Sequence, residues 1–303
     1  MKLPTLGTTP FHLTAVFHIE IAGESFDGTY EVLWLNSEQY REEFRMGKIG
    51  ETDLVLGDKR YVLRTTPILT LQLWDVRSLL AEPFPEVRDY EPKIERVYAE
   101  RDSKQFYVDV DQGADEAAGK MRYCYDVSTR KIISIHGEEP PPRFGSIPSP
   151  GFSLELSDFV PLETKRIPRR WQRNVLGQFV DVRIEKLEEV SAFASSVFQA
   201  PQHATVHDAC HPGNTKMSGR SPHFPSVELM HPKAAPAYYL LIGTDGRTQK
   251  SQAVIASGGS VDRDMETWFH DTTMPVMLCD GKPIEYETIV IPRAAAILGG
   301  MAH

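Results

Sequence analysis

The stretch HATVHDACH brings four side chains that could bind a metal ion into one short segment. His203, His207, Cys210 and His211 carry imidazole and thiol groups, and three or four such ligands can close a tetrahedral zinc site. Their spacing matches no standard zinc finger, and the surrounding residues are those of a polar connector. We therefore interpret the stretch as part of a linker without metal, and zinc is the alternative.

The cysteines are too few to be the framework of a fold. Three are present, Cys124, Cys210 and Cys279, so they cannot all pair within one molecule. One disulfide could form in an oxidising compartment, and the sequence alone leaves open which pair would form it.

Motifs of known catalytic chemistry are missing. The sequence holds no Gly-x-Ser-x-Gly, no phosphate-binding loop, no His-Glu-x-x-His and no dinucleotide fingerprint. Scattered histidine and aspartate residues decide nothing, because active sites can be assembled from distant parts of a chain. We predict that the protein is not an enzyme and that it carries no cofactor, apart from the zinc alternative.

Charge bears on the partners of this chain. A net charge of −9 argues against nucleic acid, whose binding depends on lysine and arginine at the phosphates. The basic cluster KRIPRRWQR, residues 165–173, is interpreted as a solvated turn, with attraction to anionic lipid headgroups as the alternative. No apolar run approaches the ~18 residues of a membrane helix, and the N-terminus lacks the pattern of a secretory signal.

Short strands joined by tight turns are the main signal before residue 191. Polar and apolar residues alternate from Phe11 to about Arg64, and Gly and Asp residues separate the runs. Apolar residues at Leu69, Leu73, Val76 and Leu80 predict one helix that begins near Pro67. Strand patterns then resume, interrupted by an irregular, proline-rich segment at residues 138–151. We expect about eleven strands in one large, curved antiparallel sheet with the helix across its concave face.

A compact unit follows near the end of the chain. AYYLLIG and TQKSQAVIAS predict two strands around an Asp245-Gly246 turn, and Ser260 can cap a helix after them. KPIEYETIVI predicts one closing strand, which gives the order β-β-α-β. We place the strand at Gln249–Ile255 in the centre of this small sheet and the closing strand at its edge.

The predicted fold class is therefore α+β. A curved, half-barrel-like antiparallel sheet with one helix occupies residues 1–190, and a polar linker occupies residues 191–225. The small β-β-α-β domain occupies residues 226–303.

Several phrases of the C-terminal unit resemble the C-terminal domain of TonB-family energy transducers. The matching residues are Gly243–Arg247, Ala256–Ser260, Val261–Arg263, Pro275 and Asp280–Ile284, within a region of roughly residues 227–292. The resemblance implies a periplasmic domain that binds other envelope proteins by strand addition, with a link to transport across the outer membrane. Its docking edge would be the closing strand, which holds Ile284, Glu285, Tyr286, Glu287, Thr288, Ile289 and Val290.

The N-terminal residues are similar to the half-barrels of the LolA/LolB type. The phrases that carry this resemblance are GTYEVLWLNSEQYREEF, residues 28–44, and Tyr-Cys-Tyr-Asp, residues 123–126. The resemblance implies an open β-shell that holds lipid acyl chains. The residues that would line such a cavity are Phe17, Trp34, Phe44, Leu71 and Trp74, and the alternative is that they fill an ordinary core.

Two functions remain open from the sequence. The first is a TonB-family envelope protein that docks partner proteins through the closing strand. The alternative is a periplasmic carrier or sensor of lipid or another apolar ligand, held by the N-terminal shell. Both place the protein in the periplasm, with a leader or anchor missing from this chain, and a cytoplasmic protein is the alternative location. A homodimer is compatible with either function.

Overall fold

The computed structural model describes part of the chain. The described residues are 9–81, 93–99, 104–111, 120–129, 131–137, 153–162, 165–175, 178–210, 215–219, 222, 236–258 and 260–291. Of these, 64% lie in strands and 12% in helices, so the chain is mostly β and the predicted α+β class is wrong. The predicted irregular segment at residues 138–151 lies outside the described residues.

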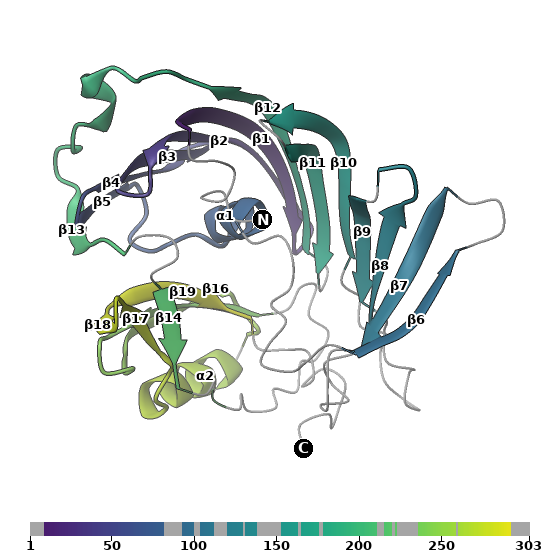
Figure 1. Ribbon diagram of the computed structural model, residues 1–303. Coiled ribbons are helices and arrows are strands. Elements are labelled where there is room, and N and C mark those ends of the chain that lie inside the picture. Colours follow the sequence, from purple (N-terminus) through teal and green to yellow (C-terminus); the bar gives the residue numbers. More distant parts are fainter. Residues whose placement is uncertain are drawn as a thin grey trace.

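One antiparallel sheet of 13 strands forms the curved back of the molecule (Figure 1). Its strands are β1 (Phe11–Ile21), β2 (Glu24–Asn36), β3 (Gln39–Met46), β4 (Ile49–Leu56), β5 (Lys59–Arg64), β6 (Lys93–Ala99), β7 (Gln105–Asp111), β8 (Lys120–Asp126), β9 (Lys131–Gly137), β10 (Ser153–Leu162), β11 (Lys165–Val175), β12 (Gln178–Glu189) and β13 (Thr205–Asp208). Their order is β13-β5-β4-β3-β2-β1-β12-β11-β10-β9-β8-β7-β6. The hairpins predicted from alternating residues are confirmed, within a sheet that is open rather than a closed barrel.

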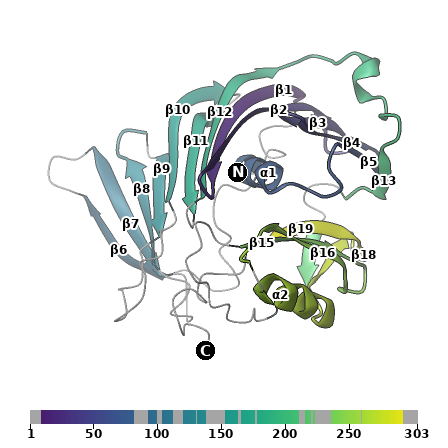
Figure 2. The ribbon, with the colours of Figure 1, turned by 180° about the vertical axis from the view of Figure 1, so that it is seen from behind.

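Helix α1 (Leu71–Ala81) lies across the concave face of this sheet, as the sequence predicts (Figures 1 and 2). It begins four residues after Pro67, where the Thr70 hydroxyl accepts the Leu73 amide at 3.3 Å and caps the first turn. Leu73, Val76, Leu79 and Leu80 are at most 2% exposed. The helix therefore buries its apolar stripe against the inward-facing residues of β1, β2 and β12.

The basic cluster at residues 165–173 is not a turn. It is most of β11, which lies between β10 and β12 in the sheet. Ile167 and Trp171 point into the core at 1% and 2% exposure, and Arg170 pairs with Asp181 of β12. The prediction is wrong because the cluster lies in an extended strand inside the sheet: Arg173 is on the core-facing side with Ile167 and Trp171 and reaches Asp75 of α1, whereas Arg170 is on the other side.

The C-terminal residues form two small sheets and one helix. The elements are β14 (Thr215–Ser218), β15 (Ala237–Ile242), β16 (Thr248–Ile255), α2 (Ser260–Asp271), β17 (Val276–Cys279), β18 (Lys282–Ile284) and β19 (Tyr286–Val290). One sheet has the order β14-β17-β18 and the other β16-β15-β19. The predicted single closing strand is thus divided at Glu285, and its two pieces belong to different sheets. This division overturns the simple β-β-α-β order.

Strand β15 is the centre of its sheet, and the predicted central strand, β16, lies at an edge. Tyr238 and Leu240 face α2 in one small core, whereas Ala237 and Tyr239 belong to the core of the large sheet. Residues of β15 are therefore buried on both faces. The almost uniformly apolar sequence of β15 is typical of a strand covered on both sides and could have identified it as the central strand.

The predicted linker, residues 191–225, contains two strands in its described part. β13 pairs with β5, and β14 pairs with β17. Cys210 forms a disulfide with Cys279 of β17, and Cys124 is a buried thiol outside any disulfide. The boundaries predicted at residues 190 and 225 stay a prediction.

Candidate functional site

The concave face of the large sheet carries three kinds of surface. Near β1 and β12 it is an apolar core under α1, near β3 to β5 it is charged, and near β6 to β9 it is apolar and partly open. The C-terminal unit lies below α1 and closes this face on the side of β3 to β5 (Figures 1 and 2).

The predicted cavity residues lie in the first of these regions. Phe17, Trp34, Phe44 and Leu71 are at most 5% exposed and belong to the main core, and Trp74 packs against it. Phe17 stacks on Phe44 with ring centres 5.1 Å apart. The structure brings these side chains together as packed core, and their contact with a ligand stays a prediction.

The charged region fixes α1 to the sheet. Arg77 of α1 reaches Glu42 at 2.9 Å, Glu51 at 3.4 Å and Asp53 at 3.3 Å. Burial opposes the ionisation of Asp53, but Arg60, which donates hydrogen bonds to both carboxylate oxygens, and Arg77 outweigh it and lower the pKa of Asp53. Sequence alternation identified these strands without showing that their charged residues face inward.

A second ion pair joins the large sheet to the C-terminal unit. Arg64 of β5 donates two hydrogen bonds to Glu287 of β19, at 2.6 and 2.5 Å, and also pairs with Glu51. The Tyr239 hydroxyl donates to the same Glu287 carboxylate at 2.7 Å. Burial alone would raise the pKa of Glu287, but these hydrogen bonds prevail and lower its pKa to about 2.

The other side of α1 carries one buried carboxyl group. Asp75 is 1% exposed, and Arg173 of β11 donates to one of its oxygens at 2.5 Å and to the Ser78 hydroxyl at 3.2 Å. The second oxygen of Asp75 has no hydrogen-bond partner among the described residues. Burial therefore outweighs the guanidinium and raises the pKa of Asp75 to about 6.

The strands β6 to β9 extend beyond α1 and the C-terminal unit, and we call them the wing (Figure 1). Residues directly opposite each other in an antiparallel pair point to the same side of the sheet. Met121 and Ile135 point into the main core, which identifies the concave side of the wing. Following the register outward defines the inner wing face: Ile94, Val97, Ala99, Phe106, Val108, Val110, Met121, Tyr123, Tyr125, Ile132 and Ile135.

The inner wing face becomes more exposed toward its edge. Ile135 is 0% and Met121 6% exposed, Val108 is partly exposed, and Val97 and Ile94 reach 62% and 63%. A continuous apolar surface thus runs from the core to the open edge. The sequence did not identify this surface, although the alternation in QFYVDVD could have suggested its inner residues.

The outer face of the wing is polar and aromatic. Tyr98 stacks on Tyr107 with ring centres 5.3 Å apart, and the Arg96 guanidinium lies 4.4 Å from the centre of the Tyr98 ring. Asp109 pairs with Arg122 at 2.9 Å. The two faces therefore differ in character: in the described part of the wing, the aliphatic side chains that the register places gather on the inner face.

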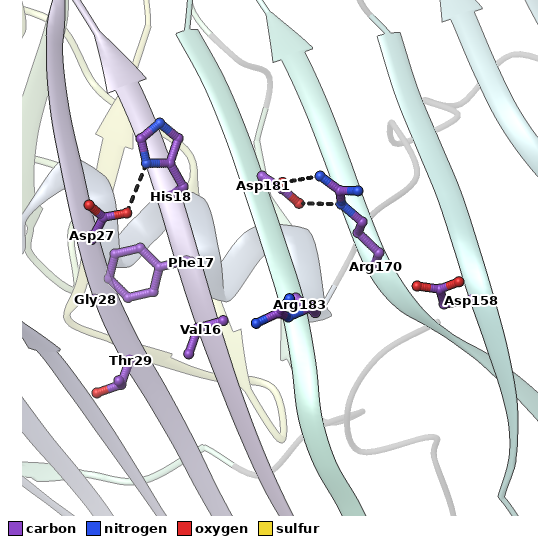
Figure 3. A pocket seen from close by; sticks show the side chains of 10 residues that line it. All are labelled: Val16, Phe17, His18, Asp27, Gly28, Thr29, Asp158, Arg170, Asp181 and Arg183. Atoms are coloured by element: carbon purple, nitrogen blue, oxygen red, sulfur yellow. Dashed lines mark hydrogen bonds and ion pairs between the residues drawn. The ribbon is translucent and has the colours of Figure 1, made fainter.

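A groove on the convex side of the large sheet has a volume of about 570 Å³ (Figure 3). His18 hydrogen-bonds Asp27 at 2.9 Å, and Arg170 hydrogen-bonds Asp181 at 3.1 and 2.7 Å. Hydrogen bonds with Asp27 and Glu20 raise the pKa of His18. His18 and Arg170 are therefore each paired with a carboxylate of the groove itself.

The predicted docking strand is divided, and most of its side chains have internal partners. Ile284 ends β18, Glu285 lies at the break, and β19 forms an edge of its sheet. The Tyr286 hydroxyl donates to the Pro275 carbonyl, and Ile289 is buried in the main core. Thr288 pairs with Leu240 of β15, while Val290 and Tyr286 pack on the small core under α2. Docking along this strand stays a prediction.

The predicted zinc ligands do not converge among the described residues. Cys210 is in the disulfide with Cys279, His207 lies in β13 and His203 in the turn before it. His211 lies outside the described residues. Within the described ranges, no group of three or more potential ligands is placed to hold a metal ion.

No family model matches the chain, and no curated protein matches it. Similar solved structures include a LolA superfamily protein from Nitrosomonas europaea, with 12% identity and a TM-score of 0.37, which spans 63% of this chain and 90% of that one. A putative outer membrane lipoprotein-sorting protein domain from Vibrio parahaemolyticus has 10% identity and a TM-score of 0.38, over 64% and 90% of the two chains. The MucA/MucB complex of Pseudomonas aeruginosa contributes a chain with 14% identity and a TM-score of 0.31, over 80% and 78%.

The N-terminal and C-terminal resemblances seen in the sequence fare differently in these comparisons. The LolA superfamily is the one that the N-terminal residues resemble, whereas nothing in the comparisons supports the TonB resemblance of the C-terminal unit. Because every TM-score here is below 0.5, we base the function on the residues of this chain. No helix in the described part of the chain is long and apolar enough to span a membrane.

Proposed function

We propose that this chain is a non-enzymatic binding protein that holds an apolar ligand, such as the acyl chain of a lipid, against the inner wing face. The observation that carries the proposal is the exposure of Ile94 and Val97, at 63% and 62%, on a surface continuous with the main core. Exposed apolar surface of this kind marks interaction sites, because covering it removes apolar area from water.

The position of this surface fits a carrier or a sensor. Each buried methylene of a ligand contributes about 0.8 kcal/mol, so an acyl chain along the wing gains affinity without any specific polar contact. The ligand would lie beside α1 rather than in its place, since the core under α1 is already filled.

The disulfide supports an oxidising compartment, and we propose the periplasm. Cys210 and Cys279 lie 69 residues apart in sequence and join the segment after β13 to β17. Such bonds form and persist outside the reducing cytosol.

Lipid binding by the purified full chain tests the proposal. Native mass spectrometry detects lipid that co-purifies, and titration with palmitic acid measures affinity for a defined acyl chain. Val108→Asp places a carboxylate in the middle of the inner wing face, so we expect affinity to fall at least about tenfold, because the carboxylate would lose its hydration.

Val206→Asp is the matched control. Val206 lies on β13 at the opposite edge of the same sheet and is 54% exposed. Its substitution should leave palmitic acid binding unchanged. Absence of binding by the native chain, or equal loss in both variants, would contradict the proposal.

A second candidate function is docking of a partner strand along β19, favoured by its position at the edge of the β16-β15-β19 sheet. Hydrogen exchange in the free protein tests it. Fast exchange of alternate amides from Tyr286 to Val290 supports an available edge, and uniform protection of all of them contradicts it.

A further inference from the structure

The large sheet ends in two edge strands that differ in how well they are protected. β13 has four residues and includes His207 and Asp208, whereas β6 has seven residues and no proline. No described strand pairs with the outer edge of β6. Natural edge strands are usually short, charged or covered, because their unpaired backbone groups attract other strands. β6 carries charge at Lys93, Glu95 and Arg96, but by length it is the less protected of the two edges.

The exposed side chains of β6 are sorted by face. Val97 and Ala99 are on the inner wing face together with Ile94, and Arg96 and Tyr98 are on the outer face. A shift in register between Ile94 and Arg96 leaves Arg96–Ala99 as the regular part of the strand. The same regular stretch in a second copy of the chain could pair with it as an antiparallel strand.

We propose that β6 pairs antiparallel with β6 of a second copy of this chain, about a two-fold axis through Val97. The axis brings Val97 opposite Val97 of the second copy, on the inner face. It also brings Arg96 opposite Tyr98 of the second copy, twice, on the outer face.

Each of these cross-strand pairs is favourable. Two valines in direct contact bury the apolar surface that each exposes alone, and an arginine beside a tyrosine ring forms a cation–π contact. Arg96 lies 4.4 Å from the ring centre of its own Tyr98, so both groups are already placed on the outer face. No like charges face each other in this register. A self-complementary patch around a two-fold axis is the usual form of a homodimer interface.

The pairing joins two 13-stranded sheets into one and brings two inner wing faces next to each other. This inference goes beyond the proposed function and does not depend on it, because the strands pair through backbone groups. If both hold, the ligand surface of the dimer is twice as wide as that of one chain.

The interface is small compared with the ~1,600 Å² of a standard protein complex, so we expect dissociation in the micromolar range. Sedimentation velocity over a concentration series should show a monomer–dimer equilibrium. Val97→Asp places two carboxylates at the axis and should leave a monomer throughout. Val206→Asp, at the other edge, should dimerise like the native chain. A native chain that is monomeric throughout, or a Val97→Asp dimer of native strength, would overturn the proposal.

Cysteine cross-linking tests the register. Val97→Cys should form a covalent dimer on mild oxidation, because side chains directly opposite across an antiparallel pair have Cβ atoms about 5 Å apart. Val127→Cys is the control, since Val127 is 51% exposed but lies after β8, away from the edge. The native Cys124 is buried and cannot substitute. Cross-linking of both variants alike, or of neither, contradicts a two-fold axis at Val97.

Discussion

Replacing Asp75 by asparagine should change how the stability of this protein depends on pH. In the folded chain burial raises the pKa of Asp75 from its ordinary value of 3.8 to about 6. The native state therefore binds this proton more tightly than the unfolded state. The contribution of Asp75 to the unfolding free energy is fully present below about pH 4 and is lost as pH rises from about 4 through about 6. A difference of about two in pKa corresponds to about 3 kcal/mol of unfolding free energy.

Asp75→Asn keeps an oxygen for the Arg173 guanidinium and removes the titration. The difference in unfolding free energy, variant minus native, should rise by about 3 kcal/mol between about pH 4 and about pH 7. Urea unfolding followed by tryptophan fluorescence measures it, because Trp171 is buried two residues before Arg173. The change of this difference with pH reports on Asp75 alone, because the other titrating groups are common to both proteins.

Asp126→Asn is the control for this experiment. Hydrogen bonds from Ser128 and Thr129 lower the pKa of Asp126 to about 2, so its contribution is complete above about pH 4. The control difference should be flat between about pH 5 and about pH 7. If the Asp75→Asn difference is equally flat, the Arg173 guanidinium holds Asp75 ionised and the reasoning from burial is wrong.

Three further substitutions address other contacts. Glu287→Gln should cost about 3 kcal/mol near neutral pH, because the buried Arg64 guanidinium loses one of its two carboxylate partners and keeps only Glu51. The difference in unfolding free energy between the native chain and this variant should fall to zero as pH falls from about 4.5 to about 2. A difference that persists at about pH 2 in urea unfolding contradicts this. Gly28→Ala would place a methyl group 2.2 Å from the Phe17 ring and 2.4 Å from a backbone carbonyl, so it should cost about 1–3 kcal/mol. An unchanged melting temperature contradicts this. Cys210→Ser removes a disulfide that spans 69 residues and should cost about 4 kcal/mol in urea unfolding, whereas equal stability would show that the bond adds nothing.

Local patterns in the sequence were enough to predict most of the large sheet. Strict alternation in β1 and β2 and the glycine-containing turns between strands act over a few residues, so they are visible without the fold. The apolar stripe of α1 is equally local. The same rule failed for β11, because its four arginines outnumber Ile167 and Trp171 and hide the period of two.

The division of the C-terminal strands and the exposure of the wing depend on the whole fold. KPIEYETIVI alternates without interruption, and only the positions of β15 and β17 determine that it splits at Glu285. Val97 and Ile135 are similar aliphatic residues in similar strands, yet their exposures are 62% and 0%. The difference comes from how far the packing around α1 extends over the sheet, which no local pattern records.

The order of strands in the large sheet also constrains how the chain folds. β1 to β5 form one meander and β6 to β12 a second, and each needs only neighbouring hairpins. The two are joined by β1 and β12, where Phe11 lies opposite Glu189. Hairpins within each meander join residues that are close in sequence, whereas the joint must wait for β12. Closing a loop of this length has a large entropic cost, so the β1–β12 joint should be the slow step of folding. Until it closes, the side of β1 away from β2 is a strand edge of 11 residues without a partner, and in this interval the chain is most open to pairing with strands of other molecules.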